Sequence, residues 1–212
     1  MKGPLPIVMA VTGASGAPYA VRLLEQLVVA RRPVSLIVSS HGWRLLQTET
    51  GIADIDALRA RTGGDAWKGL VTVFDDGDRG AAPASGSARN AGMVICPCSM
   101  GTLAAIAAGT SRSLVERAAD VALKERRRLL LITRETPLSA IHLENMLRVT
   151  NAGAMVMPAA PGFYHRPAAV ADLVVFIVAR ALDHLEVEHA IGRRWKGDEP
   201  AEKPATPRRG RR

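Results

Sequence analysis

Small hydroxyl residues and glycines follow the first apolar run of the chain, in the stretch VTGASGAPYA at residues 11–20. Gly13 and Gly16 permit a tight turn that brings backbone N–H groups close to a ligand. The start of a helix attracts an anion, because its first N–H groups are unpaired and its dipole is positive there. The turn therefore predicts a site for a phosphate, although Ser15 would serve equally well as a helix cap.

Four later segments place similar chemistry directly after apolar runs. They are Ser39 with Ser40, residues 98–102, Arg134 with Glu135, and the loop that contains Tyr164. Hydroxyl and guanidinium groups donate hydrogen bonds to phosphate oxygens, and a carboxylate can take up a proton. The set predicts a site for a phosphorylated small molecule or a mononucleotide.

Strand-like and helix-like runs alternate along the chain. Strands are predicted at residues 5–11, 33–39, 70–74, 92–97, 128–133 and 154–161, and helices at residues 17–30, 43–50, 100–109, 113–127, 139–153 and 168–185. The strands are almost continuously apolar, as in parallel sheets that are covered on both faces. The sequence predicts an α/β fold: a single-domain, Rossmann-like, doubly wound parallel sheet. Such sheets bind ligands beyond the carboxyl ends of their strands, where the polar segments above would meet.

Net charge and composition predict the bounds of the domain and where the protein resides. The chain has 212 residues and a formal net charge of +8, of which +5 falls in residues 193–212. We predict one Rossmann-like domain at 1–192 and a basic, Pro-rich extension at 193–212 that is disordered after about residue 197. The extension is interpreted as a solubilising tail, so no nucleic acid is expected. The sequence shows no signal peptide and no apolar run long enough to span a membrane, which predicts a cytoplasmic protein without a membrane partner.

Several common catalytic sites have no counterpart in the sequence. Cys96 and Cys98 are too close for a favourable disulfide and too few for a zinc site, so no metal is expected. The chain has no H-E-x-x-H, G-x-S-x-G or Walker A motif. Arg117 and Lys124 lie seven residues apart and share one helix face, which is typical of a solvated surface as well as of a ligand site.

Six stretches in order resemble the UbiX-type flavin prenyltransferases. They are TGASGAPYAVRLL, PASGS, MVICPCSMGTLAAIA, ERAADVALKERR, RETPLSAIHLENM and AAPGFYHRP. The resemblance implies a homo-oligomer, expected to be a dodecamer, with active sites at subunit interfaces. It also implies a metal-independent reaction in which dimethylallyl phosphate alkylates reduced FMN at N5 and a ring closes at C6. A UbiD-type decarboxylase would use the prenylated FMN.

The resemblance also assigns roles to individual residues. The residues implied to bind FMN are Gly13, Ala14, Ser15, Ser39, Ser99, Met100, Gly101, Thr102 and Arg134. Those implied to bind the prenyl phosphate are Ser87, Arg117, Lys124, Tyr164, Arg180 and Trp195. Those implied to be catalytic are Ser15, Glu49, Glu135 and Lys124.

The residue types suit this chemistry, and two other functions stay open at this point. Lys124, Tyr164 and Arg180 could stabilise a leaving phosphate, Ser15 and Glu49 could pair near flavin N5, and Glu135 could accept the ring proton. Some relatives have a tryptophan shortly before PASGS, whereas this chain has DDGDRGAA there. The alternatives are a flavin-dependent cysteine decarboxylase, whose P-x-M-N motif is missing here, and a flavin-binding protein without catalysis.

Overall fold

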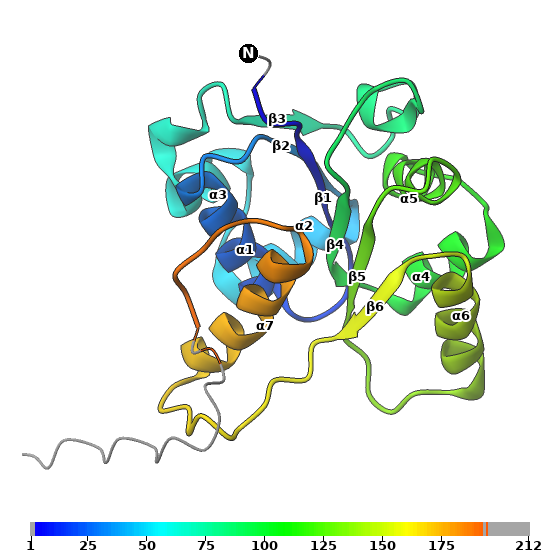
Figure 1. The fold of residues 1–212 in the computed structure, drawn as a ribbon. Helices are drawn as coiled ribbons and strands as arrows, with labels where there is room; N and C mark the ends of the chain where they lie inside the picture. The colour runs from blue at the N-terminus through cyan, green and yellow to red at the C-terminus, as the bar shows by residue number, and fades with distance from the viewer. Residues whose placement is uncertain (1–2, 193, 195–212) are drawn as a thin grey trace, which may run out of the picture.

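A computed structural model describes residues 3–192 and 194 of the chain. Its centre is one six-stranded parallel sheet in the order β3-β2-β1-β4-β5-β6 (Figure 1). The strands are β1 (Ile7–Val11), β2 (Val34–Val38), β3 (Val71–Phe74), β4 (Met93–Cys98), β5 (Leu129–Thr133) and β6 (Met155–Pro158). The helices are α1 (Ala17–Val29), α2 (Ser40–Thr50), α3 (Ile55–Thr62), α4 (Met100–Ala108), α5 (Leu114–Lys124), α6 (Ala140–Asn151) and α7 (Val170–His184). The predicted doubly wound parallel sheet is confirmed.

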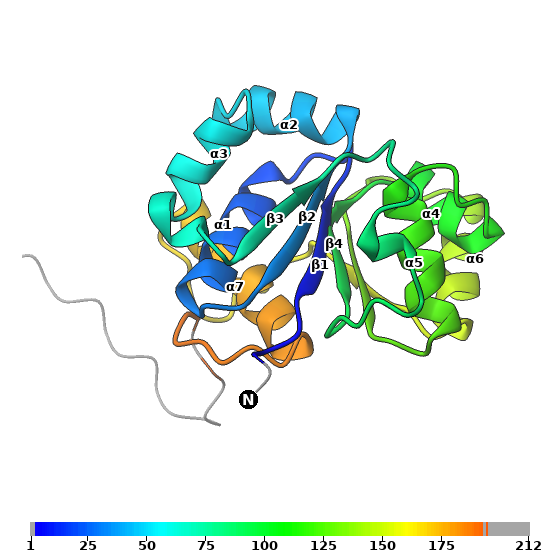
Figure 2. The ribbon, with the colours of Figure 1, turned by 90° about the horizontal axis from the view of Figure 1, so that it is seen from above.

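Helices cover both faces of the sheet, which explains why its strands are so apolar. One hydrophobic cluster packs α1, α2, α3 and α7 on one face, and a second packs α4, α5 and α6 on the other (Figure 2). Every residue of β1, β4 and β5 is buried. The strand order reverses between β1 and β4, because β2 and β3 lie on one side of β1 and β4 to β6 on the other. Open sheets of this kind bind ligands at that reversal, beyond the carboxyl ends of the strands.

The structure differs from the sequence-based prediction in several helix and strand bounds and in one additional helix. Helix α2 begins at Ser40 rather than at residue 43, because Ser39 caps it and accepts a hydrogen bond from the backbone of Gly42. Helix α3 was not predicted, since its short sequence lacks a strong apolar stripe. Residues 75–91, between β3 and β4, contain only a short 3₁₀ turn, Ala82–Ala84. The predicted C-terminal extension and Trp195 lie outside the described residues, apart from Arg194.

The two cysteines are buried in β4 and face different cores. Cys96 packs in the cluster with α1 and α7, and Cys98 in the cluster with α4 and α5. Both thiols are free. Burial raises the pKa of Cys98 to about 12, and burial followed by the nearby Cys98 charge raises the pKa of Cys96 further. Neither thiol is poised for nucleophilic chemistry.

We expect both cysteines to resist a thiol reagent in the native protein at pH 8, because the thiolate is the reactive form and burial disfavours it. A colorimetric disulfide reagent should label neither thiol until guanidinium unfolds the chain, and should then label both. Stoichiometric labelling of the folded protein would contradict the buried placement.

Within residues 3–192 and 194, no helix is long and apolar enough to cross a membrane.

Candidate active site

A cavity of about 320 Å³ lies at the strand reversal, where the carboxyl ends of β1, β2 and β4 meet. Thr12 and Gly13 line it from β1, Ser39 from β2, and Ser99 and Thr102 from the β4 side. Ser39 caps α2 and Ser99 caps α4, so the N-termini of these two helices open into the cavity. Their first-turn N–H groups have no partners within the helix, and their dipoles favour an anion. The donor set fits a phosphate.

Close backbone approach shapes one wall of this cavity. A Cβ atom added to Gly13 would lie 2.5 Å from the Cβ of His41, in the first turn of α2. Only glycine permits this approach of the β1 turn to α2. The residue therefore helps to form the cavity, and its role in binding a cofactor stays a prediction.

Thr12 joins the two halves of the cavity. Its hydroxyl donates to the carbonyl oxygen of Pro97 at 2.9 Å and accepts from the backbone N–H of Ser99 at 2.9 Å. The side chain is only 2% exposed. The hydroxyl thus fixes the start of α4 against the end of β1, and with it the predicted cofactor residues on both sides.

Thr12→Val should unfold at lower temperature and bind FMN more weakly. Valine has the same shape, but it removes the acceptor of the part-buried Ser99 N–H, at a cost of about 1–3 kcal/mol. The Pro97 carbonyl keeps its bond from the Thr12 backbone N–H. Thr12→Ser retains the hydroxyl and is the matched control. Thermal unfolding and fluorescence titration with FMN measure both effects. Equal FMN affinity in the two variants would show that Thr12 does not shape the site.

Glu49 occupies the N-terminus of α1. Its carboxylate oxygen Oε2 accepts from the backbone N–H groups of Gly16 at 2.9 Å and Ala17 at 2.8 Å. The sequence places a phosphate at the turn before this helix, and the same donors are here engaged by a side chain of the protein. The helix N-termini that face the 320 Å³ cavity are those of α2, α4 and α5. Glu49 lies beside the Ser15 turn, as predicted, but the partners the structure shows for it are backbone groups.

Arg134 connects the end of β5 to the same turn. Its Nε donates to the carbonyl oxygen of Ser15 at 3.2 Å, across the end of β4. The next residue, Glu135, is exposed, and its Oε1 accepts from the backbone N–H of Thr136 at 3.1 Å. A cation is thus presented next to Ser15 from the far side of the strand reversal, and an exposed carboxylate follows it in the chain.

Two carboxylates near the phosphate-sized cavity are already compensated. Asp76 Oδ1 accepts from the backbone N–H of Val115 at the start of α5. Glu116 pairs with Arg112 at 2.8 Å and accepts from Thr110 at 3.0 Å. Burial alone would raise the pKa of Glu116, but these hydrogen bonds and the Arg112 charge hold it below its usual range. Both acids act as helix-start and loop anchors, which reduces their repulsion of an anion.

A separate group forms around the end of α5. A Cβ atom on Gly86 would lie 2.8 Å from Lys124 Nζ, so the loop that carries Ser87 packs against this lysine. Lys124 also pairs with Glu125. Arg117, on the same helix, pairs with Asp120 at 2.8 Å. The structure therefore places the loop beside Ser87 against Lys124, and places Arg117 further along the helix.

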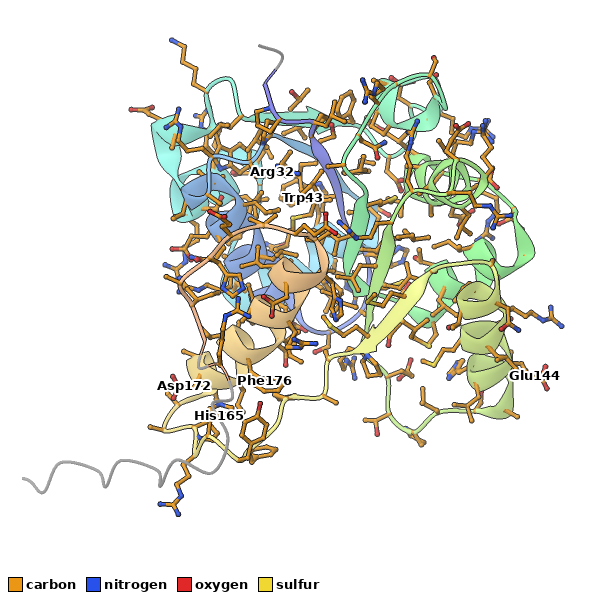
Figure 3. The ribbon with its side chains drawn as sticks, in the orientation of Figure 1. Arg32, Trp43, Glu144, His165, Asp172 and Phe176 are labelled. Atoms are coloured by element: carbon orange, nitrogen blue, oxygen red, sulfur yellow. The ribbon has the colours of Figure 1, made fainter. Side chains whose placement is uncertain are left out.

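Tyr164 and Arg180 line a different and larger cavity of about 810 Å³, formed by the loop after β6 and by α7. The rings of Tyr164, His165 and Phe176 pack on one another at centroid distances of 5.4 to 5.9 Å. Figure 3 shows His165 and Phe176 side by side at the base of α7. Tyr164 packs against the other two rings, but it is 60% exposed, so most of its side chain is accessible from the cavity.

The two predicted halves of the prenyl-phosphate site are separated within one chain. Lys124 ends α5, which packs on one face of the sheet, whereas Arg180 lies in α7 on the other face. Lys124 also precedes β5, at the amino ends of the strands, whereas Tyr164 follows β6, at the carboxyl ends. A single copy of the chain cannot bring them to one phosphate.

Comparisons with known proteins agree with this arrangement. A family model described as Flavoprotein matches residues 1–182. A flavin prenyltransferase UbiX of Pseudomonas aeruginosa is 50% identical over 201 residues, which are 92% of this chain and 96% of that protein. The chain belongs to the UbiX family. A UbiX protein of Synechocystis is 43% identical over 199 residues, or 91% of this UbiX-family chain and 96% of that protein.

Solved structures support the same family. A crystal structure of AnUbiX in complex with FMN and dimethylallyl pyrophosphate has a TM-score of 0.85 and 40% identity, covering 93% of this chain and all of that one. A dodecameric FMN-dependent UbiX-like decarboxylase from Escherichia coli O157:H7 has a TM-score of 0.83 and 40% identity, covering 91% of this chain and all of that one. The FMN-dependent cysteine decarboxylase TvaF is 14% identical with a TM-score of 0.58, and shares the fold alone with this UbiX-family chain.

Proposed function

We propose that this protein is a flavin prenyltransferase that transfers a dimethylallyl group from dimethylallyl phosphate to reduced FMN. The observation that carries the proposal is the 50% identity to a UbiX flavin prenyltransferase over nearly the whole chain. The placement of the predicted residues supports it, since the cofactor set gathers at the strand reversal. Reduced FMN, when bound, would supply the nucleophilic nitrogen N5 and the ring carbon C6.

The cavity at the ends of β1, β2 and β4 would hold the FMN phosphate. Ser39, Ser99 and Thr102 offer hydroxyl groups there, beside the N-termini of α2 and α4. Gly13 allows α2 to approach the β1 turn closely, which shapes this wall of the cavity. Arg134, which reaches the Ser15 carbonyl, would fix the cofactor on the other side of the turn.

The leaving phosphate would be bound by groups from two copies of the chain. Cleavage of the allylic carbon–oxygen bond leaves negative charge on the phosphate, and preorganised donors lower the barrier by stabilising that charge. Tyr164 and Arg180 of one copy would donate to the phosphate from the larger cavity, and Lys124 and Ser87 of another would complete the site. The metal-independent mechanism is consistent with this cationic set.

Glu135 would accept the proton that leaves when the new ring closes. Its carboxylate is exposed, next to Arg134, and free to reach a substrate. Glu49 would keep the Ser15 turn in place, because it holds the first two N–H groups of α1. Glu135 would thus act as the acid–base group, and Glu49 would act only on the structure of the turn.

The assembly and partners form part of the same proposal. A homologous structure is a dodecamer, and the separation of Lys124 from Arg180 supports a homo-oligomer with shared sites. A UbiD-type decarboxylase as the user of the product rests on the family resemblance, and cytoplasmic residence stays a prediction. No group of three His, Cys, Asp or Glu side chains within the described residues is arranged to hold a metal ion.

Release of the leaving group tests the proposal. Purified protein is mixed under anaerobic conditions with FMN, reduced or oxidised, and with dimethylallyl phosphate or its diphosphate. We expect release of one inorganic phosphate per reduced flavin from the monophosphate, and none with oxidised FMN. Release of pyrophosphate from the diphosphate alone would change the substrate assignment. The same release with oxidised flavin would refute prenyl transfer to FMN.

A further inference from the structure

One carboxylate organises the cavity that Tyr164 and Arg180 line. Asp183 Oδ2 accepts from Arg180 Nη1 at 3.3 Å, one turn away on α7. The other oxygen, Oδ1, accepts from Arg194 Nη2 at 2.8 Å and lies 3.2 Å from His189 Nε2. Asp183 therefore links Arg180 to the segment of chain that follows α7.

His189 fixes the orientation of this carboxylate. Its side chain is 4% exposed. Its Nδ1 lies 3.1 Å from the carbonyl oxygen of Ile191, and its Nε2 faces Asp183 Oδ1. A carboxylate oxygen is an acceptor, so the contact with Asp183 places a proton on Nε2 of His189. Two donors, from His189 and Arg194, thus hold Oδ1 and leave Oδ2 for Arg180.

The carboxylate meets Arg180 as a full charge. Burial opposes ionisation of Asp183, but hydrogen bonds from Arg194 and His189, together with their charges, hold its pKa below the usual range. The side chain of Asp183 is 24% exposed, whereas that of Arg180 is 53% exposed. The guanidinium is therefore held by Asp183 at Nη1, and its Nη2 lies 3.5 Å from His184 Nε2. About half of the Arg180 side chain remains exposed on the wall of the cavity, where a ligand can reach it.

We propose that Asp183 is a positioning residue that orients the Arg180 guanidinium to bind the phosphate of dimethylallyl phosphate. The inference rests on the proposed function and adds a residue to the same site. An arginine that is already held in one orientation loses less conformational freedom when it binds an anion. Asp183, His189 and Arg194 would thus act on the substrate only through Arg180.

Calorimetric titration of dimethylallyl phosphate into protein loaded with oxidised FMN tests this without turnover. Asp183→Asn should weaken binding about 10- to 100-fold, the effect of losing a hydrogen bond to a charged group. In an Arg180→Ala background, the same Asp183→Asn change should alter the dissociation constant less than about twofold, because coupled residues are not additive. Glu25→Gln, which removes the carboxylate of the Arg22–Glu25 pair on α1, should leave binding unchanged in both backgrounds.

Two results would overturn the inference: an equal loss in both backgrounds, which marks a general structural role, or unchanged binding in Asp183→Asn. Thermal unfolding and FMN content show whether Asp183→Asn is folded. In case it is not, a pair of variants at His189 provides a second test. His189→Leu removes a donor to Oδ1 of Asp183 and should weaken the binding of dimethylallyl phosphate. His189→Gln retains a donor and should bind it nearly as well as the wild type. Equal binding by these two variants would also count against the inference. A wild-type protein that does not bind dimethylallyl phosphate would instead contradict the proposed function itself.

Discussion

A Glu135→Gln variant is expected to bind FMN and dimethylallyl phosphate but to form prenylated FMN about 10²- to 10⁴-fold more slowly, the usual contribution of a positioned acid–base group. The amide has the same shape as the carboxylate and cannot take up the proton that ring closure releases. Glu135 is exposed and accepts a hydrogen bond from the backbone N–H of the neighbouring Thr136, so the free energy of unfolding should change little. Anaerobic rapid-quench kinetics with mass detection of the flavin measures the rate.

Glu144→Gln is the matched control. Glu144 is also exposed and lies on the outer side of α6, away from the strand reversal (Figure 3). It should prenylate FMN at the wild-type rate. A wild-type rate in Glu135→Gln would show that another group accepts the proton, whereas loss of FMN in that variant would assign Glu135 to cofactor binding.

Mixed oligomers of Lys124→Met and Arg180→Ala should regain activity that neither variant has alone. Each change removes one cationic donor to the leaving phosphate, at a cost of about 10²- to 10³-fold. Because the two residues lie on opposite faces of the sheet, each site would take them from different copies. Random mixing in equal amounts would restore both groups in about a quarter of the sites of a symmetric assembly.

Co-expression with two affinity tags provides the mixed oligomers for this test. A mixture of Tyr164→Phe and Arg180→Ala is the control, because both residues line one cavity of one chain and no site in that mixture regains both. Recovery in the first mixture and none in the second supports shared sites. Mixed Lys124→Met and Arg180→Ala oligomers that are as inactive as their parents would place the two residues in separate functions.

The sheet and the cofactor edge could be predicted because they depend on local patterns. Strands buried on both faces are continuous apolar runs, so their ends, and hence Ser39, Ser99 and Arg134, could be placed from the sequence. Helix α3 is short and weakly amphipathic, and only its Asp54 cap and the glycine after it mark its bounds. Those two signals would have found it.

Long-range contacts could not be predicted in the same way. Glu49 reaches the N-terminus of α1 from thirty-three residues away, and no pattern in either segment specifies that pairing. The family resemblance groups Lys124 with Arg180, whereas the packing of α5 and α7 on opposite faces appears only in three dimensions. Asp183 resembles any helix-surface acid until His189 and Arg194 are seen to converge on it.

Mass spectrometry of the flavin is the most direct test of the central claim. Wild-type protein is incubated without oxygen with reduced FMN and dimethylallyl phosphate, and the flavin is then extracted and analysed. The account predicts FMN that carries one added isoprene unit, formed only when protein, reduced flavin and prenyl phosphate are all present. Recovery of unmodified FMN from the complete mixture, with both ligands shown to be bound, would contradict it.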